Sequence, residues 1–166
     1  MYELKRLSRE AVPAALEKAQ RYRLLNEPME AESICLDVLE VEPENQRALT
    51  TLLLALTDQF DERLAEAVPR AREVLSRLRD PYGRAYYGGL IAERRAKAQM
   101  RRGGLGAAHA AYEGLRQAMA LFEEAAAVRP PGDDEALLRW NTCARLLMGH
   151  RELVPAPPDA GEQMLE

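Results

Sequence analysis

The sequence predicts an all-α protein of about seven helices in antiparallel pairs, and three observations lead to this prediction. Between the prolines and glycines, apolar residues recur three and four positions apart, as on one face of an amphipathic helix. The apolar content is rich in Ala and Leu, and only 5% of residues are aromatic. Ala and Leu favour helices because they lose little side-chain freedom there. No segment shows the strict alternation of a half-buried strand.

The first four predicted helices lie between Ser8 and Pro81. Ser8 is a candidate N-cap for the first helix, which extends to about Leu25. Pro28 suits the first turn of the second helix, which ends before Pro43 because the residue preceding a proline disfavours helical backbone. The apolar stripes of the four helices are Val12, Ala15, Leu16, Ala19 and Tyr22; Ala31, Ile34, Cys35, Val38 and Leu39; Leu49, Leu52, Leu53, Leu56 and Phe60; and Leu64, Val68, Ala71, Val74, Leu75 and Leu78.

Three further helices are predicted after Pro81. The fifth runs from about residue 82 to 102, where Gly103-Gly104 stops it, and the sixth from about 105 to 128. Asp133 or Asp134 caps the seventh, which carries Trp140 and Cys143 on its buried stripe. We therefore expect one helical domain over residues 1–150, followed by a Pro-rich flexible tail over residues 151–166.

Residues 12–45 resemble one tetratricopeptide repeat, a helix pair of about 34 residues. Tyr22 takes the aromatic position of the first helix, and Ala19 and Ala31 take small positions. Pro43 is the closing proline, and Cys35 departs from the pattern where a large aromatic is usual. The small, aromatic, small, proline spacing returns in the sixth helix, at Ala118, Phe122, Ala125 and Pro130.

The resemblance implies a short right-handed superhelix of stacked helix pairs. Its repeats would span residues 12–45, 46–81 and 82–130, with a final unpaired helix over 133–149. The middle pair departs most from the repeat pattern, and the third pair carries an insertion at Gly103 to Ala110. A plain helical bundle with accidental spacing is the alternative.

Charge and cysteine content restrict the classes of partner. The net charge of −4 argues against nucleic acid, whose phosphates require an excess of Lys and Arg on one face. We expect Cys35 and Cys143 to be buried and reduced, because both occupy apolar helical positions. The charged N-terminal segment and the lack of a long apolar run predict a cytoplasmic protein with no membrane partner.

The sequence predicts neither an enzyme nor a cofactor or metal site. His109 and His150 are far apart, and neither has a second His or Cys at metal-ligand spacing. The Gly103-Gly104-Leu105-Gly106 segment lacks the preceding strand and the lysine of a phosphate-binding loop. Cys143 has no neighbouring His that would activate it as a nucleophile.

In the tetratricopeptide family the first helix of each pair lines the concave face, and the resemblance places polar residues there. Arg can hold a carboxylate through two hydrogen bonds, so these positions would suit an acidic peptide. The predicted peptide-binding residues are Arg23, Arg47, Thr50, Leu54, Gly88, Gly89, Arg95, Asn141 and Arg145, with Gln20 and Ala92 on the same lining.

Two interpretations of the Gly88-Gly89 pair remain open. Each glycine costs about 1 kcal/mol relative to Ala inside a helix, so the pair serves either close packing against the preceding helices or a trough for a ligand backbone. The family's known carboxylate clamp for chaperone tails is absent, since its Lys and Asn positions hold Leu16, Gln20, Thr51, Ala85 and Gly89 here.

The resulting functional hypothesis is a non-catalytic scaffold that binds a protein or peptide on its concave face. The first alternative is a structural module that forms a homodimer through the unpaired last helix, by way of Leu146, Leu147 and Met148. The second is a sensor for a small ligand in the groove.

Overall fold

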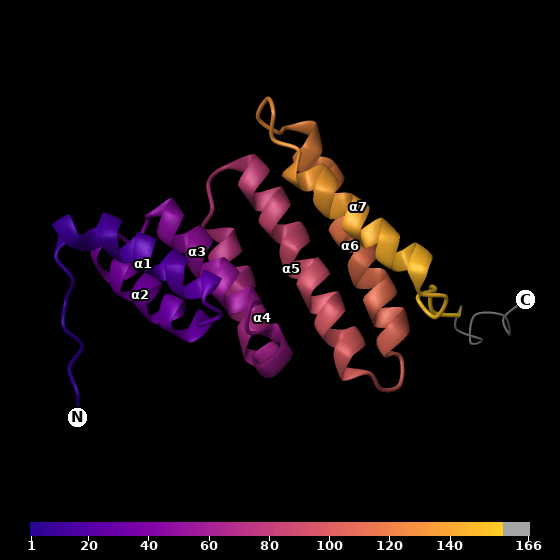
Figure 1. The fold of residues 1–166 in the computed structure, drawn as a ribbon, viewed down its shortest axis with the longest axis horizontal. Coiled ribbons are helices and arrows are strands. Elements are labelled where there is room, and N and C mark those ends of the chain that lie inside the picture. The colour runs from indigo at the N-terminus through magenta and orange to yellow at the C-terminus, as the bar shows by residue number, and fades with distance from the viewer. Residues whose placement is uncertain (158–166) are drawn as a thin grey trace, which may run out of the picture.

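Helices alone make up the regular structure of the part of the chain that the computed structural model describes, residues 1–157 (Figure 1). A 3₁₀ turn at Arg9–Ala11 precedes seven α-helices in this range. They are α1 (Val12–Leu24), α2 (Pro28–Val41), α3 (Gln46–Thr57), α4 (Phe60–Ser76), α5 (Pro81–Arg102), α6 (Ala107–Ala127) and α7 (Glu135–Gly149). The expected all-α class is confirmed.

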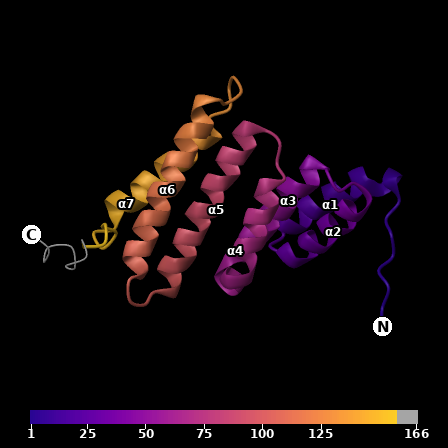
Figure 2. The ribbon, with the colours of Figure 1, turned by 180° about the vertical axis from the view of Figure 1, so that it is seen from behind.

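The helices pack mostly against their neighbours in sequence, so the molecule is a row that runs from α1 to α7 (Figures 1 and 2). Two contacts go beyond this order, because α1 also touches α3 and α3 also touches α5. Helices α1, α3 and α5 therefore lie side by side on one face of the row. We call it the α1–α3–α5 face.

Proline, aspartate and glycine end and begin these helices for local reasons. Pro28 and Pro81 each occupy the first turn of a helix, where the missing N–H removes no hydrogen bond. Asp80 accepts a hydrogen bond from the Gly83 N–H at 3.0 Å and so caps α5. Gly103 has a φ of 66°, a left-handed conformation that few residues other than glycine adopt, and it ends α5.

Some local details differ from the prediction. Ser8 makes no side-chain capping bond, and α1 begins four residues later, at Val12, with Pro13 in its first turn. Phe60 belongs to the start of α4 rather than to α3, although it is buried as expected. The backbone of Arg63 leaves helical geometry, so the regular part of α4 begins at Leu64 and contains Pro69 in an early turn.

Two hydrophobic cores meet on α5. The first joins α1 to α4 and includes Ile91 and Ala98 of α5, whereas the second joins α5 to α7 and includes Ala92 and Ala96. The repeat residues Ala19, Ala31, Ala118, Phe122 and Ala125 are all fully buried. Their small side chains allow close helix crossing, which is how the sequence pattern shapes this row.

Up to residue 157, the segment after α7 contains one buried residue, Leu153. Leu153 is buried in the second core, and the carbonyl of Val154 lies 2.9 Å from His109 Nδ1. The expected flexible tail covered residues 151–166, and its last nine positions, 158–166, lie outside the described residues. Leu153 and Val154 therefore lie against the second core and α6.

Candidate functional site

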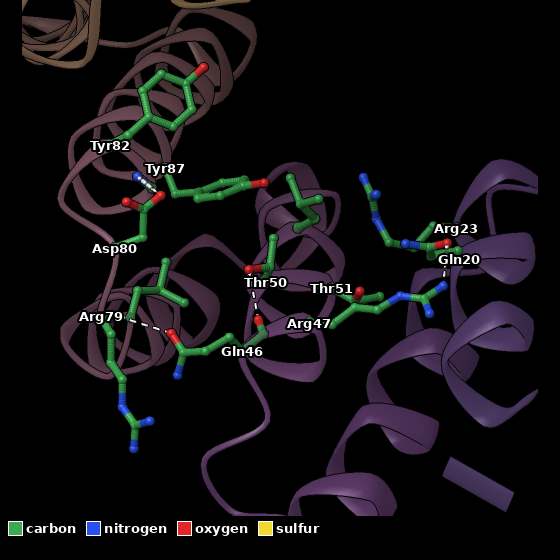
Figure 3. A pocket seen from close by; sticks show the side chains of 13 residues that line it. Gln20, Arg23, Gln46, Arg47, Thr50, Thr51, Arg79, Asp80, Tyr82 and Tyr87 are labelled. Carbon is green, nitrogen blue, oxygen red and sulfur yellow. Dashed lines mark hydrogen bonds between the residues drawn. The ribbon is translucent and has the colours of Figure 1, made fainter. Parts of the chain in front are cut away.

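A groove of about 570 Å³ opens on the α1–α3–α5 face (Figure 3). It lies between α1, α3, the first turns of α5 and the α4–α5 connection. Its lining residues are Gln20, Arg23, Gln46, Arg47, Thr50, Thr51, Leu54, Leu78, Arg79, Asp80, Tyr82, Gly83 and Tyr87. Such a mixture of apolar side chains and a few polar groups is typical of a ligand pocket.

One end of the groove is cationic. The Arg47 guanidinium donates to Gln20 Oε1 at 3.2 Å, which joins α3 to α1. Among residues 1–157 no carboxylate lies within 4 Å of Arg47, whose side chain is exposed. Arg23 uses its Nε to bind Asp58 Oδ2 at 2.7 Å. Arg47 therefore retains hydrogen-bond donors for an anionic group in the groove.

The other end is mainly apolar, with the charged side chains of Asp80 and Arg79 at its edge. Leu54, Leu78 and Tyr87 form most of it, and the Tyr87 ring points across the groove in Figure 3, whereas Tyr82 packs toward the second core. Burial raises the pKa of Tyr82 and of Tyr87 above the ordinary value for a phenol, and Asp133 adds to the effect at Tyr82. Both phenols are thus neutral at physiological pH.

Hydrogen bonds fix the wall of the groove between these ends. Gln46 Nε2 donates to the Arg77 carbonyl at 3.3 Å, and the Arg79 N–H donates to Gln46 Oε1 at 2.9 Å. Thr50 Oγ1 donates to the Gln46 carbonyl at 2.8 Å. This one glutamine holds the α4–α5 connection against α3, so the groove is formed without a ligand.

The structure brings four of the nine predicted site residues together. Arg23, Arg47, Thr50 and Leu54 all line the groove, and Gln20 lines it beside them. Gln20 and Arg23 belong to α1, and Arg47, Thr50 and Leu54 belong to α3. Their placement follows from the contact between α1 and α3.

The double glycine belongs to the packing between helices, so the trough interpretation was wrong. An ideal Cβ on Gly88 would lie 3.5 Å from Leu75 and 3.6 Å from Leu121. On Gly89 it would lie 2.7 Å from the Phe122 ring, which is closer than real Cβ contacts. Both glycines are buried, and Gly89 makes room for Phe122.

Arg95, Asn141 and Arg145 lie away from the groove. Arg95 lines a separate pocket of about 390 Å³ between α5 and α6, together with Ala92, Ala96, Gln99, Ala110, Glu113, Gly114 and Gln117. Asn141 and Arg145 are exposed on α7 and do not line the groove. Of the residues considered for self-association, Leu146 and Leu147 pack against the second core, whereas Met148 is exposed.

A one-residue error in register explains the misplaced α5 positions. The groove uses Gly83 and Tyr87, which are four residues apart, whereas the prediction used Gly88, Ala92 and Arg95. One residue rotates a side chain by about 100° around a helix, which turns Gly88 and Gly89 away from the groove and into the packing between helices. The Tyr-rich segment from Tyr82 to Tyr87 was the available signal, because aromatic residues are scarce elsewhere in this chain.

The histidines and cysteines do not converge within the described residues. His109 contacts a backbone carbonyl, and His150 lies 3.0 Å from Glu152. Burial raises the pKa of both Cys35 and Cys143 to about 12, which keeps the thiols protonated. Residues 1–157 contain no group of three metal-ligating side chains. No helix in this range is long and apolar enough to cross a bilayer.

Comparison of the chain with family models, curated proteins and solved structures found no match. Its function must therefore be inferred from the groove and the surfaces around it.

Proposed function

We propose that this protein is a non-catalytic scaffold that binds a polypeptide segment in the groove of the α1–α3–α5 face. The observation that supports this most is the pairing, in one preformed groove, of an exposed guanidinium that has no carboxylate partner among residues 1–157 and a mainly apolar end. Three consecutive first helices contribute to it, as expected for a surface that binds an extended chain.

The groove chemistry favours a short acidic and apolar segment. The carboxylate of an Asp or Glu would bind Arg47, which can donate two parallel hydrogen bonds to it. An aromatic or aliphatic side chain would pack between Leu54, Leu78 and Tyr87. Gln20 already orients Arg47 through a hydrogen bond, so less side-chain freedom is lost on binding.

We also propose that the row is a tetratricopeptide-like, right-handed superhelix whose first helices line the binding face. The sequential packing, the α1–α3 and α3–α5 contacts and the buried small residues support this. An experimental structure with the opposite hand of stacking, or with α2 and α4 lining the groove, would exclude it.

Selection of peptides from a random display library against the full-length protein tests the binding proposal. Enriched sequences should combine an acidic residue with an aromatic or aliphatic residue a few positions away. A synthetic peptide with an enriched sequence should then compete with the displayed peptides for binding to the protein. Failure to enrich any sequence, or enrichment of basic sequences, would contradict the proposed chemistry.

Self-association through α7 is the second candidate, and exposed apolar residues on that helix favour it. Leu138 is 59% exposed and Met148 is 77% exposed. A dimer built on this face would bring both side chains out of water. Analytical ultracentrifugation over a wide concentration range tests it, and a constant monomer mass would exclude it.

A further inference from the structure

A second pocket lies next to the groove and is rich in charged residues. It has a volume of about 240 Å³ between the α3–α4 turn, α5 and α7. Asp58 connects the two sites, because it binds Arg23 of the groove and Arg94 of this pocket. We call it the charged pocket; its lining residues are Thr57, Asp58, Phe60, Asp61, Glu93, Arg94, Lys97, Arg101 and Arg139.

Each carboxylate of the charged pocket already has a cationic partner. Asp58 binds Arg94, and Asp61 Oδ1 lies 2.6 Å from Arg101. Glu93 Oε1 accepts from Lys97 and lies 3.5 Å from Arg139 Nη1. The lining therefore holds four cations and three carboxylates, a small excess of positive charge.

One polar atom of the residues that line the pocket has no hydrogen-bond partner in the described part of the chain. Glu93 is fully buried, and its Oε2 has no hydrogen-bond partner among the described residues. A buried carboxylate oxygen without a donor is unfavourable, so a donor group that reached it would be stabilised. Lys97 and Arg139, which contact the other oxygen, have side chains 25% and 33% exposed, so both can shift to admit one.

We propose that the charged pocket is a second binding site, and that it takes a neutral carboxamide. The carboxamide N–H would donate to Glu93 Oε2, and its carbonyl would accept from Arg139 or Lys97. A cation would meet two cations already placed at Glu93, and an anion would face the unpartnered carboxylate oxygen. The volume exceeds the roughly 30 Å³ share of one water several-fold, which leaves room for an Asn or Gln side chain or for a peptide unit.

Three small molecules of equal shape test this site on the wild-type protein. Acetamide, acetone and acetate share a methyl group and a carbonyl, but only acetamide is a neutral N–H donor. Each is titrated into ¹⁵N-labelled protein up to about 100 mM, because a fragment this small binds weakly. We expect saturating shifts of the Glu93, Arg94 and Lys97 amides with acetamide, at roughly tenfold lower concentration than with acetone.

The other outcomes contradict the proposal. Equal shifts with acetone would show that the N–H is not recognised, and stronger binding of acetate would show an anion site. If none of the three molecules produces a saturating shift, the pocket binds no carboxamide and only water can reach Glu93 Oε2. The titration reads the charged pocket only, so it can fail while peptide binding in the groove holds.

The variant Glu93→Gln supplies a second arm. Lys97 and Arg139 are hydrogen-bond donors, so the amide oxygen of the introduced glutamine would turn toward them. The NH₂ group of that amide would then occupy the position of Oε2 and could not accept a hydrogen bond. The preference for acetamide over acetone should then disappear. Glu113→Gln, on the exposed side of α6, is the matched control and should keep it. If Glu93→Gln does not fold, the comparison of the three molecules on the wild type decides alone.

Discussion

At the scale of single residues, the two adjacent glycines of α5 have different surroundings. Both avoid a side chain where helices meet, but only Gly89 lies against a rigid neighbour. Phe122 is fully buried and packs 5.9 Å from the Tyr86 ring, so it has little room to move. Gly88 faces leucine methyl groups at ordinary contact distance. The sequence showed the pair, but only the structure separates the two roles.

Alanine substitutions should separate these roles. Gly89→Ala should lower the free energy of unfolding by about 1–3 kcal/mol, because overpacking against Phe122 outweighs the gain in helix propensity. Gly88→Ala is the matched control, and it should be neutral or stabilising by up to about 1 kcal/mol. Urea unfolding followed by circular dichroism measures both. Equal effects at the two positions would show that Phe122 moves aside.

The buried cysteines give a second prediction at this scale. Because burial raises the thiol pKa to about 12 in the folded state, neither cysteine should react with iodoacetamide at pH 8 until the protein unfolds. The unfolded thiols ionise near 9, so the contribution of these groups to stability is complete below pH 9 and is lost as the pH rises toward 12. Mass spectrometry of labelling with and without urea checks this. Equal labelling rates would contradict it.

At the scale of helices, the sequence predicts where elements begin and end better than which way they face. Pro28, Pro81 and Gly103 mark boundaries through local backbone chemistry, and the structure places these boundaries where expected. Which residues of a helix face the groove is predicted by counting positions along the repeat pattern. The middle pair departs from that pattern, so the positions predicted on α5 are displaced by one residue. On α7, Arg139 reaches Glu93 whereas Asn141 and Arg145 face solvent. Nothing local in the sequence corrects such a shift.

The ion pairs around Asp58 should matter more for stability than those at Asp61. Asp58 joins α1 to α5 through Arg23 and Arg94, with side chains only 19–22% exposed. Asp58→Asn should lower the free energy of unfolding by about 1–3 kcal/mol, because two partly buried cations lose their partner. Asp61→Asn removes an exposed pair with Arg101 and should change it by less than about 1 kcal/mol. Urea unfolding of both variants measures the difference, and equal effects would contradict it.

At the scale of the whole molecule, α5 is the shared element of the two hydrophobic cores. It supplies Ile91 to the first core and Ala96 to the second, and it also forms one wall of the groove. In a row of helices that contact mainly their neighbours, the end helices are covered on one side only. The free energy of local unfolding should therefore be lowest in α1 and α7 and highest in α5.

Amide hydrogen exchange under native conditions tests this distribution. The amides of Leu90, Ile91 and Ala96 should exchange most slowly, and those of α1 and α7 faster, because the end helices open without disrupting both cores. Mass spectrometry with peptide-level resolution reports it. Slowest exchange in α1 or α7 would show that the cores do not depend on α5 in this way.

The central claim is that Arg47 and the groove around it bind a peptide, and one affinity comparison tests it most directly. A labelled peptide from the display selection is measured by fluorescence anisotropy against wild type, Arg47→Ala and Arg145→Ala. Both arginines are exposed, but only Arg47 lines the groove. We predict that Arg47→Ala raises the dissociation constant about three- to tenfold, while Arg145→Ala leaves it unchanged. An unchanged affinity for Arg47→Ala, or an equal loss for both variants, would contradict the account.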